Sequence, residues 1–143
     1  MYDLLLILHF LGLALGVGTS FAFLALGIAS KDLAPAERLA FVKRTFALSK
    51  NGSIGLALLI VSGIGFLLTR GVSAMFAVGG PAFHAKLTLV VLLCGFVGYS
   101  QVLMKRIRTA SDPAAAAARL PTIGRIMLLL GVSIVICAVL AFH

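Results

Sequence analysis

The chain has 143 residues, of which 62% are hydrophobic and only 11% are charged, and its formal net charge is +8. Soluble domains average about 45–50% apolar and about 25% charged residues, so this composition excludes an ordinary water-soluble domain and predicts a lipid bilayer as the main partner. The basic residues lie between apolar runs, which is typical of membrane topology signals, and we exclude nucleic acid as a partner.

Four apolar runs are long enough to cross a bilayer, which takes about 20 helical residues. Backbone polar groups in hydrocarbon must be satisfied within their own segment, so these runs are predicted to be helices. Residues 1–143 form a single predicted membrane domain. Its spans are about 4–29, 54–69 (with a helical cytoplasmic extension from about 35), 82–104 and 123–142, and Pro81 and Pro121 are expected at the starts of the last two.

The basic residues also predict the orientation of the chain. Ten of the twelve Lys and Arg residues lie in the first and third connections, and only Arg70 and Lys86 border the second. The positive-inside rule places the first and third connections in the cytoplasm. We therefore predict an all-α fold: a four-helix transmembrane antiparallel bundle in the bacterial inner (cell) membrane, with both termini on the non-cytoplasmic side.

Small and polar residues predict which face of each helix points inward, because membrane helices approach each other through small side chains. On the first helix the predicted inward face carries a histidine and a Gly-x-x-x-Gly step, and on the third it carries a second histidine. The four predicted inward faces are His9, Gly12, Gly16, Ser20, Phe23 and Gly27; Asn51, Gly55, Ser62 and Phe66; His84, Thr88, Val91, Gly95 and Gly98; and Gly124, Met127, Gly131, Val135 and Ala138.

Ionisable residues inside apolar spans are costly, so each is a candidate functional residue whose partner must be found. His9 and His84 are predicted to face each other near the non-cytoplasmic side of the membrane. Lys86 lies about 200° around the helix from His84 at about 100° per residue. Two interpretations follow: Lys86 extends to the headgroups from a lipid-facing position, or its face meets the second helix or a second subunit.

Two sequence motifs resemble those of HemJ-type membrane protoporphyrinogen oxidases and of the surrounding small four-helix proteins, including CopD-like copper-resistance proteins. They are Leu-His-Phe-Leu-Gly at residues 8–12 and Phe-His-Ala-Lys-Leu-Thr at residues 83–88. The resemblance covers the layout of all four helices, but the motif similarity is limited to the first and third. It implies b-type haem, an oxidoreductase activity, and key roles for His9 and Lys86, with His84 in the same His-x-Lys motif.

The chain also departs from the HemJ pattern. Residues 25–29 read Ala-Leu-Gly-Ile-Ala and residues 95–99 read Gly-Phe-Val-Gly-Tyr, where HemJ proteins usually carry an Arg and a further His, and a Tyr-His pair. The chain contains no Trp. These differences predict a relative outside the true oxidases.

The first functional hypothesis is therefore a membrane protein that binds haem b and has a possible redox role. Neutral imidazole is a common axial ligand of haem iron, which makes His9 and His84 the candidate ligands. The cations of Lys86 and Arg70 are candidate partners of the haem propionates.

Two other hypotheses remain open. His9 and His84, joined by His143 and Met75, are candidate N and S ligands of copper or another divalent metal, as a CopD-like protein needs. Alternatively, the bundle is a non-catalytic membrane scaffold or assembly subunit, because small-residue faces are also what plain helix packing requires. A homodimer is expected for the haem hypothesis, since four short helices leave part of a large porphyrin uncovered.

Overall fold

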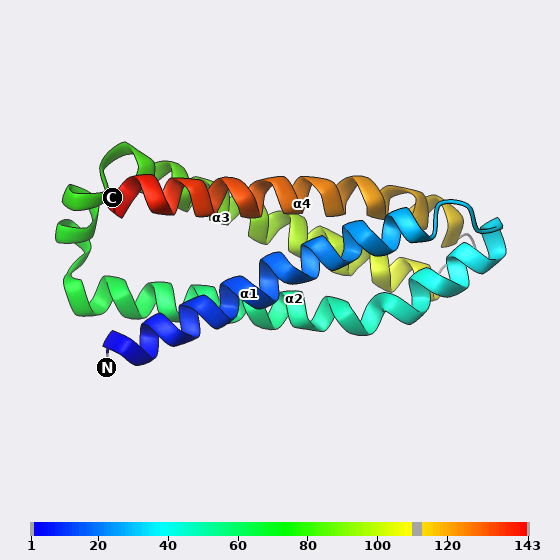
Figure 1. The fold of residues 1–143 in the computed structure, drawn as a ribbon, viewed down its shortest axis with the longest axis horizontal. Helices are drawn as coiled ribbons and strands as arrows, with labels where there is room; N and C mark the ends of the chain where they lie inside the picture. The colour runs from blue at the N-terminus through cyan, green and yellow to red at the C-terminus, as the bar shows by residue number, and fades with distance from the viewer. Residues whose placement is uncertain (1, 110–112, 143) are drawn as a thin grey trace.

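The computed structural model describes residues 2–109 and 113–142, and these residues form four helices (Figure 1). The helices are α1 (Tyr2–Ala29), α2 (Pro35–Arg70), α3 (Val72–Thr109) and α4 (Pro113–Phe142). Each of these four is long and apolar enough to cross a membrane. The all-helical prediction is thus confirmed, and the chain is a small multi-pass integral membrane protein.

The helices form two hairpins placed side by side. α1 packs mainly along α2, and α3 mainly along α4, with fewer contacts between the hairpins. The start of α1, the α2–α3 connection and the end of α4 lie at one end of the molecule, which we call the terminal end (Figure 1). The α1–α2 and α3–α4 connections lie at the opposite end, which we call the basic end because ten Lys and Arg residues flank these connections in the sequence.

Glycines bring α1 and α2 into close contact near the middle of their spans. A Cβ atom at Gly55 would lie 2.6 Å from the backbone nitrogen of Gly16 and 2.8 Å from the carbonyl oxygen of Gly12. Both neighbours are backbone atoms, so no side-chain movement would make room for it. The Gly12–Gly16 step predicted from the sequence is therefore the surface through which α1 crosses α2.

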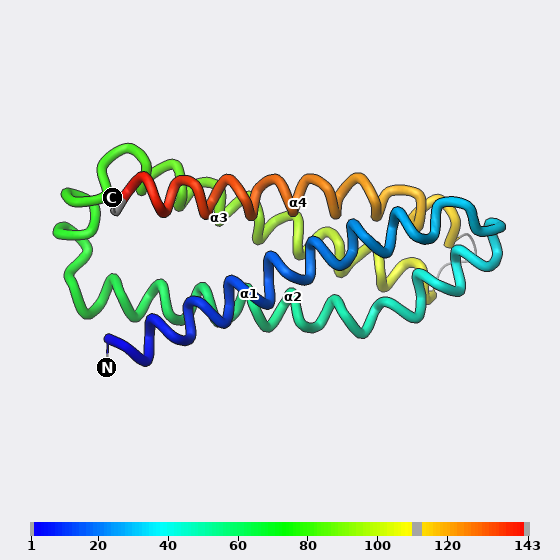
Figure 2. Tube along the Cα trace, viewed as in Figure 1, coloured from blue at the N-terminus to red at the C-terminus, as the bar shows by residue number. Residues whose placement is uncertain are grey.

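A sharp bend divides α3 near its beginning. Gly80 has φ 49° and ψ −148°, a conformation that other residues rarely adopt, and Pro81 follows it. The turns before Gly80 lie across the terminal end before the chain runs along α4 (Figure 2). The Phe76 ring contacts those of Phe83 and His84 across the bend, with centroids 5.2 and 4.8 Å apart. The helix therefore begins ten residues before the expected start, and Pro81, expected at that start, follows the bend instead.

The start of α4 differs from the prediction. The helix begins at Pro113, and Pro121 lies inside it rather than at its first turn. Pro113 has the fixed φ that suits a first helical position, and the five alanines at 114–118 have the highest helix propensity of any residue. Proline at position 121 removes one backbone hydrogen bond, but the helix continues through it because strong helix formers precede it.

Several almost fully buried side chains lie toward the basic end. Phe46 on α2 is 3% exposed, and Leu103 and Ile107 on α3 are 2% and 1% exposed. Ile123 on α4 and Ser30, just after α1, are also buried there. Residues of α2, α3 and α4, and the residue that follows α1, are therefore buried toward this end.

Candidate functional site

A histidine and a serine form a hydrogen-bonded pair between α1 and α2. His9 Nδ1 lies 2.8 Å from the hydroxyl oxygen of Ser62, whose side chain is fully buried. The pair lies on the terminal-end side of the glycine contact, since His9 is one turn before Gly12 on α1. The inward positions predicted for His9 and Ser62 are confirmed by this contact, whereas Asn51, predicted on the same face of α2, is exposed.

The bonding of Ser62 determines which nitrogen of His9 carries its proton. The single hydroxyl proton of Ser62 is directed to the carbonyl oxygen of Leu58, one turn earlier on α2. The Ser62 oxygen must therefore accept from His9, so Nδ1 carries the N–H. In a neutral imidazole the other nitrogen is then unprotonated, which leaves the Nε2 lone pair as an acceptor or metal ligand.

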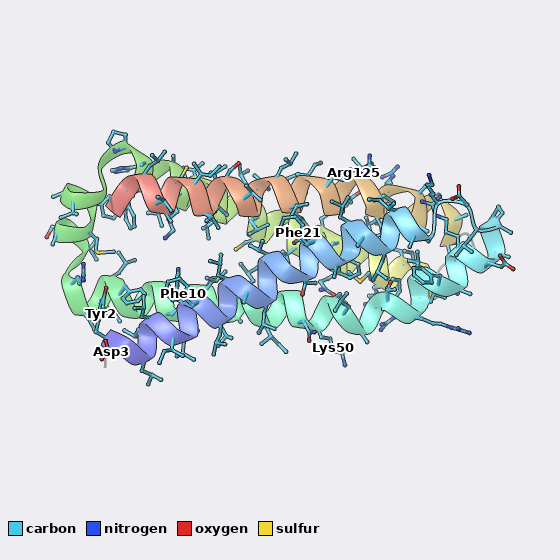
Figure 3. The ribbon with its side chains drawn as sticks, in the orientation of Figure 1. Tyr2, Asp3, Phe10, Phe21, Lys50 and Arg125 are labelled. Carbon is cyan, nitrogen blue, oxygen red and sulfur yellow. The ribbon has the colours of Figure 1, made fainter. Side chains whose placement is uncertain are left out.

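Aromatic rings connect this pair to the terminal end of the bundle. The Phe66 ring, one turn from Ser62, lies against His9 with centroids 5.7 Å apart and against Tyr2 at 5.4 Å. Arg70, at the end of α2, donates from Nη2 to the Tyr2 hydroxyl over 3.1 Å, and its guanidinium carbon lies 4.8 Å from the Tyr2 ring centroid. Tyr2 marks this end in Figure 3. Arg70 is thus a fixed cation at the edge of the bundle, separated from His9 by aromatic rings.

Lys86 belongs to the same region as His9. Its side chain is half-buried on α3, at the same end of the bundle as His9. Val90, Leu93 and Val97, which share its face, are also partly buried. Whether this face meets α2 or a second subunit, as one of the two interpretations holds, stays a prediction.

The structure places His84 on the outer surface, unlike the sequence interpretation. His84 is exposed, and its Nδ1 donates to the carbonyl oxygen of Gly80 over 2.9 Å, at the bend of α3. The other residues of its predicted inward face are exposed as well, and Val91 is 70% exposed. The exposed set is Thr88, Val91, Gly95 and Gly98. The predicted inward face of α3 is therefore wrong, and His84 does not meet His9.

The physical reason is that small residues do not mark the inside of a lipid-embedded helix unambiguously. Lipid tails are as apolar as leucine, so valine and leucine occur equally on packed and lipid-facing sides. On α3 the packed side carries large side chains such as Phe83, Leu103 and Ile107. The outward face carries Gly95 and Gly98 but also Val91 and Leu92. The homodimer expected from the sequence stays a prediction.

The other candidate ligands do not gather around His9. Met75 lines a shallow hollow of about 200 Å³ with Arg70, Ala74 and Val78 at the terminal end. His143 lies outside the described residues. Within residues 2–109 and 113–142, no group of three or more His, Cys, Asp or Glu side chains is placed to hold a metal ion.

The sequence interpretation placed Ser62 on an inward face but did not identify it as the partner of His9. One signal was available: Ser62 is the single hydroxyl residue in the apolar run 54–68. A lone polar side chain in such a run needs a partner in the bundle.

Comparisons of the chain with models of protein families, with curated proteins and with solved structures find no match.

Proposed function

We propose that the chain is a multi-pass protein of the bacterial inner membrane, with its four helices antiparallel and its terminal end on the non-cytoplasmic side. Ten of its twelve basic residues flank the connections at the basic end. Cytoplasmic connections carry such an excess of Lys and Arg, which supports a cytoplasmic basic end. His9, Lys86 and Arg70 then lie in the half of the membrane that faces away from the cytoplasm.

We further propose that the protein binds haem b through His9, with a redox role. The observation that carries this proposal is the hydrogen bond from His9 Nδ1 to buried Ser62, which leaves Nε2 free. Histidine ligands of metals almost always donate their other ring N–H to a fixed acceptor, which orients the ring and sets the tautomer. Ser62 has that role here.

The surrounding side chains suit the acidic edge of a porphyrin. Haem supplies an iron that accepts imidazole nitrogen and changes oxidation state by one electron. Lys86, at the same end of the bundle as His9, and Arg70, at the edge of the bundle, are cations of the kind that pair with propionate groups. Phe66 contributes an apolar wall next to the imidazole.

The residues fit a haem with one protein ligand rather than two. His84 donates its Nδ1 proton to the bend of α3 and faces outward, so it does not complete a pair with His9. The same separation removes the support for the copper site of a CopD-like protein, which needs several ligands around one ion. We therefore assign the ligand role to His9 alone and a structural role to His84.

Absorption spectroscopy tests this proposal. The protein, purified in mild detergent and titrated with haemin, is expected to show a Soret band that shifts reversibly on reduction. His9→Ala should abolish the band, whereas His84→Ala, the matched control, should retain it. If wild-type protein shows no Soret band, or if His9→Ala binds haemin as wild type does, the haem proposal is wrong and a non-catalytic scaffold becomes the better account.

A further inference from the structure

A second site lies at the opposite end of the molecule, along the line where α2 meets α3. Gln101 Nε2 on α3 donates to the Ser53 hydroxyl on α2 over 3.0 Å. Two helical turns farther toward the basic end, the Arg108 guanidinium carbon lies 5.1 Å from the ring centroid of Phe46. From the first contact to the second, the position moves seven residues back along α2, from 53 to 46, and seven residues forward along α3, from 101 to 108. The two contacts therefore define one regular antiparallel seam, which we call the α2–α3 seam.

Four cations lie along this seam. Lys43 and Lys50 lie three residues before and four residues after Phe46, so they share its side of α2. Lys105 lies three residues before Arg108 on α3 in the same way. All four cations are exposed. No acidic residue occurs in the seam segments 43–53 and 101–108, so the positive charge there has no local carboxylate to neutralise it.

The seam cations lie at the depth of the phospholipid headgroups. Lys50 and Arg70 are twenty positions apart on α2, which corresponds to about 30 Å at about 1.5 Å per residue. The hydrocarbon core of a bilayer is about 30 Å thick, so these two cations mark its two edges. Figure 3 shows Lys50 well inside the basic end, with α2 continuing beyond it. Phe46 and Arg108 lie about one turn farther out, in the headgroup layer.

Contact with Phe46 fixes the orientation of the Arg108 guanidinium. Phe46 is almost fully buried, so its ring is a rigid surface for the flat cation. Stacking on a ring occupies the face of a guanidinium but leaves the N–H donors at its edge available, and these match the geometry of phosphate oxygens. Lys50 and Lys105 add point charges on either side of the seam.

We propose that the α2–α3 seam is a binding site for the phosphate of an anionic phospholipid in the leaflet at the basic end. Arg108 is the oriented donor, and Lys43, Lys50 and Lys105 supply the positive field. Clusters of basic residues next to membrane helices attract anionic lipids, with each cation contributing about 1 kcal/mol near the surface. The site is independent of His9 and of any ligand bound at the terminal end.

Native mass spectrometry of the full chain in mild detergent tests this proposal. The protein is mixed with equal amounts of phosphatidylglycerol and phosphatidylcholine of the same acyl chains, and the ratio of bound lipids is measured. Wild type should retain phosphatidylglycerol in preference. The double variant Lys105→Gln/Arg108→Gln should reduce that preference by about tenfold or more, because two cations are lost. A second double variant, Lys43→Gln/Lys50→Gln, removes the two exposed lysines of α2 and should also reduce the preference for phosphatidylglycerol.

The matched control is Arg119→Gln/Arg125→Gln, which removes two cations from α4 near the same end, one of them bonded to Tyr99 on α3, and should lower the preference less than either seam double variant. An equal loss in this control would assign the preference to total charge and overturn the seam site. Equal retention of the two lipids by wild type would also overturn it. Displacement of phosphatidylglycerol by an equal concentration of inorganic phosphate would assign the seam to a soluble anion instead.

Discussion

The two ends of the bundle are held together in different ways. At the basic end, the buried side chains of Phe46, Leu103 and Ile107 come from two helices and lie at or beyond the level of Lys50. At the terminal end, the interface of α1 and α2 carries a polar pair, His9 and Ser62. Under the proposed orientation the basic end extends beyond the hydrocarbon, where burial of apolar surface from water stabilises a fold by about 25 cal/mol per Å².

Inside the hydrocarbon that driving force is missing, because lipid tails are as apolar as the side chains. Close backbone contact at Gly12 and Gly55, together with hydrogen bonds, must hold α1 to α2 there. From this difference we expect packing at the basic end to contribute more to stability than packing at the terminal end.

The largest expected effect is from removing a ring at the basic end. Phe46→Ala should lower the free energy of unfolding by about 3–5 kcal/mol, the usual cost of deleting a buried phenylalanine. Phe66→Ala, the matched change at the terminal end, should cost less than half as much, because Phe66 is only partly buried. Denaturation of both variants in the same detergent measures the comparison, and equal losses would remove the proposed difference between the ends.

The second effect concerns the glycine contact. Gly55→Ala places a methyl group against the backbone of α1, and overpacking of this kind typically costs about 1–3 kcal/mol. Gly63→Ala is the matched control on the same helix, because a Cβ atom there meets nothing within 4 Å. The unfolding midpoint should fall for Gly55→Ala alone. A Gly55→Ala protein as stable as Gly63→Ala would show that α1 and α2 do not meet through these glycines.

The third effect is the loss of the polar pair. Ser62→Ala leaves the His9 N–H without its acceptor, and hydrogen bonds between membrane helices contribute about 0.6 kcal/mol on average and at most about 1.7 kcal/mol. A double-mutant cycle with His9→Ala should give a coupling energy in that range. The two substitutions would instead be additive if the side chains made no contact in the membrane.

The smallest effect is expected at the edge of the terminal end. Arg70→Gln loses the hydrogen bond to the Tyr2 hydroxyl and the stacking on its ring, both at exposed positions. An exposed cation–π contact contributes about 0.5–1 kcal/mol, so the unfolding free energy should fall by no more than that. Haemin affinity, measured in parallel, should fall if Arg70 pairs with a propionate. A loss of stability well above this range would mean that Arg70 has a structural role that the structure does not show.

Much of the fold follows from the sequence because hydrocarbon permits so few backbone conformations. The four spans are set by their apolar length, and the contact of α1 with α2 is set by Gly12, Gly16 and Gly55. The bend at Gly80 followed by Pro81 was recognised only as a helix start. The positive φ at Gly80 goes with the way the preceding turns lie across the bundle, where the Phe76 ring contacts that of Phe83. The residues next to Gly80 in the sequence do not specify this arrangement.

The candidate site was predicted only in part. His9 was placed on an inward face because glycines accompany it on one side of α1. The facing direction of α3 could not be derived from its residues, since small and large side chains occur on both of its sides: Ser100 is buried, whereas Val91 and Leu92 are exposed. The exposed position of His84 removes it as the partner of His9. This exposure could be recognised only from the packing of α3 against the other helices.

The tautomer of His9 is the most direct test of the account, because the free Nε2 is the basis of the proposed ligand role. Nitrogen-15 NMR of ring-labelled histidine in the ligand-free protein distinguishes protonated from unprotonated nitrogens, and the His9 signals are assigned by their loss in His9→Ala. The account predicts a protonated Nδ1 and an unprotonated Nε2 in wild type, and a loss of this fixed tautomer in Ser62→Ala. A His9 ring protonated at Nε2 alone would contradict the hydrogen bond to Ser62 and the proposed site with it.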